Sequence, residues 1–150
     1  MRLILLAATL LVACAGHAVA APRLGGQTQL SFAPGQGMQV EYLGTDGHSW
    51  LWHPGNQAVL AGTWKFEEAD ICFRYGAGSY DPAAGERGGS WNCVPYELYR
   101  ITIVESRRGD TFALRDRKQV PFALPRKRLS HDQLQILARG GNGVASRTGS

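Results

Sequence analysis

Four side chains that could act together in catalysis or metal binding fall close together: Asp46, His48, Ser49 and His53. A serine, a histidine and an acid can form a nucleophilic triad, and histidines with a carboxylate can hold a metal ion. The spacing argues against both uses, because neighbours on a strand point to opposite faces, which separates His48 from Ser49. His48 and His53 are an odd number of residues apart, so on a strand their side chains would point to opposite faces. They remain only weak ligand-binding candidates.

A second acidic group, Glu67, Glu68 and Asp70, comes shortly before Cys72. Paired carboxylates can exchange protons during catalysis. Acids crowded at a strand junction are more typical of a turn that faces water, and these lack the spacing of a calcium-binding loop. We therefore expect no catalytic set, no metal and no cofactor, and favour a protein that is not an enzyme.

The start of the chain has the pattern of a secretory signal peptide. A basic residue precedes a short apolar run, and small side chains lead to a cleavage site between Ala20 and Ala21. Cleavage there predicts a periplasmic or secreted protein. Residues 11–14 form an alternative lipoprotein signal, in which Cys14 is acylated and anchors the protein in the outer membrane. The two cleavages exclude each other, and we prefer the one after Ala20.

Export decides how the cysteines are interpreted. The chain has three, and removal of a leader that contains Cys14 leaves Cys72 and Cys93. Disulfides form in oxidising compartments, so we expect these two to pair. The bond closes a glycine-rich loop, Gly76–Ser90, and is expected to stabilise the fold by roughly 3 kcal/mol. No Cys-x-x-Cys motif is present, so redox and haem-attachment sites lack their signature.

Aromatic residues crowd the middle of the chain, and positive charge gathers late. Trp50 and Trp52 share a strand face, which would be a stacking platform for sugars or apolar ligands if exposed; burial in a core is the commoner arrangement. Arg126, Lys127 and Arg128 could bind an anionic envelope component, although a solvated basic face is the simpler interpretation. An exported protein gives no reason to expect nucleic acid as a partner.

The pattern around these residues predicts an all-β domain. Short alternating segments separated by turn signals indicate a single antiparallel meander, closed as a small barrel or a sandwich. Asp46-Gly47 is the best hairpin signal, and His53-Pro54-Gly55-Asn56 suits a type II turn. Gly62 is expected to form a bulge. The expected strands are Gln27–Phe32, Met38–Leu43, His48–Trp52, Gln57–Leu60, Thr63–Glu67, Asp70–Tyr75, Tyr99–Glu105 and Asp110–Leu114.

The C-terminal part predicts one short helix. Ser130 and Gln133 can form a capping box, and Leu129 can meet Leu134 as a hydrophobic staple. Gly140 is expected to end this helix. No segment after the signal is long and apolar enough to span a membrane. The domain plan is a signal peptide at 1–20, a β domain at 21–128, a short helix at 129–140 and a disordered tail at 141–150.

Several short motifs follow one another between Met38 and Ile103. They are a strand and turn at Tyr42–Gly47, then Gly62-Thr63-Trp64, Ile71-Cys72-Phe73, Trp91-Asn92-Cys93 and Tyr99-Arg100. This order resembles a core in small exported bacterial proteins of unknown function, where a Gly-x-Trp strand leads to two cysteines on either side of a loop. The resemblance implies a secreted, disulfide-linked β domain with no known activity. The glycine-rich insert and the basic C-terminal third lie outside it.

Three hypotheses of function follow. The preferred one is a non-enzymatic periplasmic or envelope protein that acts as a binding or structural module. The second is an envelope hydrolase or metal-dependent enzyme that uses Asp46, His48 and the Gly76–Ser90 loop, and it requires a histidine and an acid in one cleft. The third is a small-molecule carrier with an aromatic pocket, which requires an apolar cavity of about 300 Å³ or more.

Overall fold

The computed structural model describes residues 23–77, 79–81 and 86–145. The signal peptide, the Ala20–Ala21 cleavage site and Cys14 lie outside these residues, as does the end of the chain at 146–150. Export and lipidation therefore stay predictions from the sequence.

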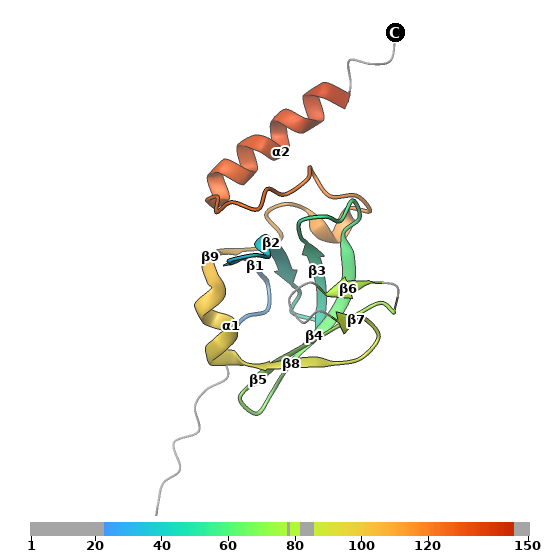
Figure 1. Ribbon diagram of the computed structural model, residues 1–150, viewed down its shortest axis with the longest axis vertical. Coiled ribbons are helices and arrows are strands. Elements are labelled where there is room, and N and C mark those ends of the chain that lie inside the picture. Colours follow the sequence, from blue (N-terminus) through green and yellow to red (C-terminus); the bar gives the residue numbers. More distant parts are fainter. Residues whose placement is uncertain (1–22, 78, 82–85, 146–150) are drawn as a thin grey trace, which may run out of the picture.

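A seven-stranded antiparallel sheet forms the body of the protein, in the order β8-β5-β4-β3-β2-β1-β9, and it curls into a half-barrel (Figure 1). Its strands are β1 (Gln27–Ala33), β2 (Gly37–Leu43), β3 (His48–Trp52), β4 (Leu60–Glu67), β5 (Asp70–Tyr75), β8 (Asn92–Pro95) and β9 (Ile103–Arg108). Strands β1 to β5 pair with their sequence neighbours, which confirms the predicted all-β meander. A separate two-stranded sheet, β6 (Tyr80–Asp81) and β7 (Glu86–Arg87), lies in the excursion between β5 and β8.

A helix occupies part of a segment that the sequence predicts as a strand. Helix α1 (Tyr96–Thr102) connects β8 to β9, the two edges of the sheet, so the predicted strand Tyr99–Glu105 is half wrong. The chain must cross from one edge to the other, and a helix does so while pairing its own backbone groups. Tyr96 and Tyr99 lie half-buried against the sheet, whereas Ile101 is exposed.

Gly62 does not form the predicted bulge. It lies inside the continuous strand β4, which contains the expected strand Thr63–Glu67 but only Leu60 of the expected strand Gln57–Leu60. β4 pairs in regular register with β3 and β5. Glycine is needed because the ring of Tyr75 lies over it: a Cβ at position 62 would come 2.6 Å from Tyr75 Cδ1. The absent side chain thus makes room for an aromatic ring on the neighbouring strand.

The segment Asp110–Leu114 is a turn rather than the predicted last strand. The carboxylate of Asp110 accepts hydrogen bonds from the amides of Leu114 and Arg115, both at 2.8 Å. These bonds begin a short 3₁₀ helix, η1 (Leu114–Asp116). The side chain of Asp110 therefore favours a local turn over strand pairing.

The two predicted turns are present, one of them in a longer form. At His53–Asn56, Gly55 has a φ of 92° and the Asn56 amide donates to the His53 carbonyl at 3.4 Å. At the β2–β3 hairpin only Gly47 has a positive φ, of 80°, and the Gly44 amide donates to the His48 carbonyl at 2.8 Å. The hairpin loop thus spans more than the two residues that the Asp-Gly signal predicts.

The C-terminal third covers one face of the sheet, here called the outer face. Trp52 is its central side chain, fully buried, with its ring centroid 5.5 Å from that of Phe112 and 4.9 Å from that of Phe122. Its indole N–H donates to the Phe122 carbonyl at 3.1 Å. The buried cluster on this face also contains Leu30, Met38, Val40, Leu114, Leu124, Leu129, Leu134 and Ala138.

Helix α2 (His131–Ala145) follows this covering segment. Its first turns bury Leu134 and Ala138 in the outer cluster, and its far end projects from the body of the protein (Figure 1). Its start confirms the capping box: the Gln133 amide donates to Ser130 Oγ at 3.3 Å, and the Ser130 amide donates to Gln133 Oε1 at 2.9 Å. The helix continues past Gly140, so the predicted end at 140 is wrong. A helical glycine costs only about 1 kcal/mol relative to alanine, which does not by itself stop a helix. No helix in the described ranges is long and apolar enough to cross a membrane.

Candidate functional site

A cavity of about 320 Å³ opens on the opposite face of the sheet, here called the inner face. Strands β1, β2, β3, β5 and β8 form its wall, and α1 lies across it. Its apolar lining includes Leu51, Phe73, Val94 and Leu98. The curl of the sheet and the crossing helix thus leave space on this face.

The polar part of the wall centres on Glu41, a carboxylate that is 8% exposed. The hydroxyl of Tyr75 donates a hydrogen bond to Glu41 Oε1. Burial raises the pKa of the Tyr75 hydroxyl well above its ordinary value, and the nearby Glu41 raises it further. Burial and Glu41 likewise raise the pKa of Tyr99, on α1. Both phenols therefore stay protonated at neutral pH.

Three motif residues of the sequence hold this wall in place. Gly62 leaves room for the Tyr75 ring, which is stacked beside Phe73 with centroids 6.4 Å apart. Trp64 donates its indole N–H to the Gly44 carbonyl at 2.9 Å and ties β4 to the β2–β3 hairpin. Tyr99 packs on Phe73, with centroids 5.6 Å apart, and thereby seats α1 over the cavity.

Asp46 and His48, the acid and the histidine of the enzyme hypothesis, pair at the β2–β3 hairpin, away from Ser49. His48 Nδ1 lies 3.4 Å from Asp46 Oδ2, and both side chains are more than half exposed. The pKa of the Asp46 carboxyl lies below its ordinary value, chiefly because the His48 amide donates to it. Ser49 is buried on the inner face, so it does not join His48 as a nucleophile. The pair faces solvent instead of lining the cavity described above.

Trp50 and Trp52, which could form a stacking platform only if exposed, have different environments. Trp50 is half-buried under the Arg115 guanidinium, which lies 4.8 Å from its ring centroid, and the Tyr42 ring stacks beside it at 5.6 Å. Trp52 is sealed inside the outer cluster. They share a face, as parity requires, but the C-terminal segment covers Trp52, so the pair does not form an exposed surface.

His53 is separated from His48 by the length of β3. It is 4% exposed, and its Nδ1 lies 2.9 Å from the Pro54 carbonyl oxygen. A strand rises about 3.3 Å per residue, which puts the two histidines at opposite ends of β3. They therefore do not share a ligand.

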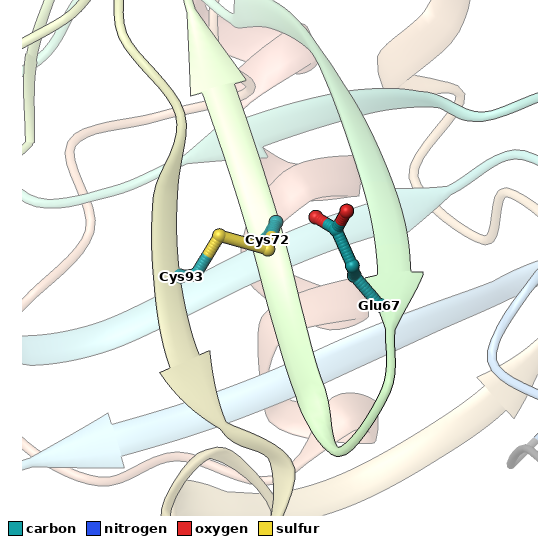
Figure 2. A group of neighbouring side chains, drawn as sticks. All are labelled: Glu67, Cys72 and Cys93. Carbon is teal, nitrogen blue, oxygen red and sulfur yellow. A yellow bond between two sulfur atoms is a disulfide. The ribbon is translucent and has the colours of Figure 1, made fainter.

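Cys72 and Cys93 form the predicted disulfide, directly opposite each other on β5 and β8 with Cα atoms 4.0 Å apart. The Glu67 carboxylate lies beside the bond, and the potential ligand atoms of the three residues fall within 4.8 Å of one another (Figure 2). Sulfurs bonded to each other are not the thiolates that metals require. Glu67 also pairs with Lys65 Nζ at 2.5 Å. The three residues are therefore a cross-strand disulfide and the carboxylate of a neighbouring ion pair, not a set of metal ligands.

Arg126, Lys127 and Arg128 are exposed in the covering segment. Arg126 donates to the Gly35 carbonyl at 3.3 Å, and its backbone packs on Gly37, where a Cβ would come 2.9 Å from Arg126 Cα. The basic cluster is thus fixed to the β1–β2 turn and remains open to solvent. Its anionic partner stays a prediction.

Sequence reasoning did not identify Glu41, Tyr75 or Tyr99 as site residues. A signal was present: Gln39, Glu41 and Leu43 have one parity in β2, which places two polar side chains on the face of a buried leucine. The alternation suggested that the polar residues face water. Both faces are in fact covered, and Glu41 faces the cavity.

No protein-family model, curated protein or solved structure matches this chain.

Proposed function

We propose that the protein is an exported, non-enzymatic binding module that holds a small organic molecule in the inner-face cavity. The observation that supports this most directly is the cavity itself. Binding pockets for small molecules occupy about 300–1,000 Å³ and combine an apolar lining with a few convergent polar groups. The cavity, at about 320 Å³, meets the size that the carrier hypothesis requires.

The chemistry of the lining favours binding over catalysis. Among the described lining residues there is no histidine and no cysteine. The two phenols stay protonated at neutral pH, so they are poor bases. Asp46 and His48, the pair on which the hydrolase hypothesis depends, lie at the exposed hairpin.

Export is supported by the N-terminal pattern together with the disulfide, which is compatible with an oxidising compartment. The intact mass of the protein from the cell envelope tests this step. Cleavage after Ala20 without added lipid is the expected result. A chain that retains residues 1–20, or that carries acyl groups on Cys14, contradicts it.

Binding is tested with the neutral fluorescent probe N-phenyl-1-naphthylamine, which brightens in apolar surroundings. We expect saturable binding to the oxidised chain that begins at Ala21. Val94→Trp should fill the cavity and weaken probe binding at least about tenfold, because the larger side chain occupies the volume that the probe needs. Ile136→Trp, on the exposed side of α2, is the matched control.

The two variants are compared only if each keeps the thermal stability of the parent protein. If Val94→Trp fails to fold, Leu98→Trp at the cavity mouth takes its place. The proposal is wrong if the probe does not bind, or if it binds a folded cavity variant as tightly as it binds Ile136→Trp.

A further inference from the structure

The cavity differs in chemistry between its depth and its mouth. At depth lies the Glu41 carboxylate with the Tyr75 hydroxyl bonded to it. At the mouth lies Leu98, which is 58% exposed and also lines the cavity. Ile101 is 71% exposed, and residues three apart are neighbours on a helix surface, so it extends this apolar rim along α1.

We propose that the ligand is a small amphiphile that enters with a hydrogen-bond-donating end, an amine or a hydroxyl, and leaves its apolar body between α1 and the sheet. The cavity discriminates against the same body with an anionic end. This inference depends on the proposed binding function, and it adds the chemical class of the ligand.

The polar end follows from what the deep groups can offer. A carboxyl group accepts hydrogen bonds at both oxygens, and each oxygen can accept more than one, so Glu41 can accept a donor from a ligand while keeping the partners that it already has. Two carboxylates that share a buried site cannot both be ionised without a large cost in free energy, so an anionic end is disfavoured beside Glu41. The phenols of Tyr75 and Tyr99 remain neutral, so they add no charge of their own.

The apolar end follows from the rings and the rim. Phe73 and Tyr99 pack on one another in the wall, and Val94 lies beside them on β8. Exposed apolar side chains that adjoin a cavity are a common mark of a ligand-binding site. A body with an aromatic ring or a short alkyl chain would cover both the wall and the Leu98 rim.

Three matched compounds test the class: 4-phenylbutylamine, 4-phenylbutanol and 4-phenylbutanoate, each used to displace N-phenyl-1-naphthylamine. We expect the amine and the alcohol to compete at least about tenfold more strongly than the acid, because like charges placed together cost free energy. Stronger competition by the amine than by the alcohol would indicate a cationic donor, and the reverse would indicate a neutral one.

Glu41→Gln should bring the acid to the level of the alcohol, while Glu67→Gln, which removes a negative charge beside the disulfide, should leave the order unchanged. If the probe binds but the acid competes as well as the others, or none of the three competes, the ligand class is wrong and the binding function stands. If the probe itself does not bind, the binding function has failed.

Discussion

Trp52 and Leu51 are neighbours in β3, yet their side chains enter two different interiors. Trp52 is enclosed by the C-terminal segment in a dense cluster of rings and aliphatic side chains. Leu51 points to the inner face, where the wall includes a carboxylate and encloses open volume. Both faces bury apolar side chains, but the inner face combines a smaller cluster, which includes Leu43 and Ile71, with a carboxyl group and space for a ligand.

Removal of one aromatic ring from each face should show how much each face contributes to the free energy of unfolding. Trp52→Ala should lower the free energy of unfolding by about 3–5 kcal/mol, the usual cost of removing a large buried ring. Phe73→Ala, on the inner face, should lower it by only roughly 1–2 kcal/mol because the ring is half-buried. Urea denaturation of both variants measures the difference. Equal losses would show that the inner face is as important for stability as the outer one.

The disulfide joins β8, at the edge of the sheet, to β5. Replacing Cys72 and Cys93 by alanine should cost about 3 kcal/mol, given their separation of 21 residues. β8 pairs only with β5, so its amides should lose protection from hydrogen exchange before those of β2. Reductant should destabilise the parent and not the variant. Uniform loss of protection across the sheet would contradict this local role.

The smallest effect concerns pH. The pKa values of Tyr75 and Tyr99 are raised in the fold from an ordinary value of 10.0. Above that pH the unfolded chain releases protons that the folded chain retains, so stability is full below about pH 10 and falls as the pH rises further. Tyr75→Phe should flatten this decline, as measured by urea denaturation at several alkaline pH values. An unchanged slope would place the Tyr75 phenol outside the buried wall.

Much of the fold follows from local signals. Alternation in segments such as Met38–Leu43 predicts strands, and Ser130 with Gln133 predicts the start of α2. The pairing of Cys72 with Cys93 follows from counting the cysteines that the predicted signal cleavage leaves. Helix α1 is not predicted by these signals, because Ile101 and Ile103 follow the alternating pattern that is typical of a strand. A helix there is favoured only by the need to connect two distant edges of one sheet.

The candidate site was harder to predict for a different reason. Parity shows that Gln39, Glu41 and Leu43 share a face, but it does not show what covers either face. That depends on the C-terminal segment, which is irregular and reaches the outer face only through tertiary contacts such as Phe122 with Trp52. Asp46 and His48 can be recognised as a possible pair because they are close in the sequence, whereas Glu41 and Tyr75 come together only in the folded protein.

The crossing of α1 between β8 and β9 also bears on self-association. An open sheet presents unpaired backbone groups at its two borders, where other chains can add and begin aggregation. Here one border is a four-residue strand that ends in Pro95, and the other ends in Arg107 and Arg108. A proline cannot donate a backbone hydrogen bond, and charged ends disfavour stacking of like chains. The same helix that roofs the cavity thus joins two borders that are poor templates for fibre growth.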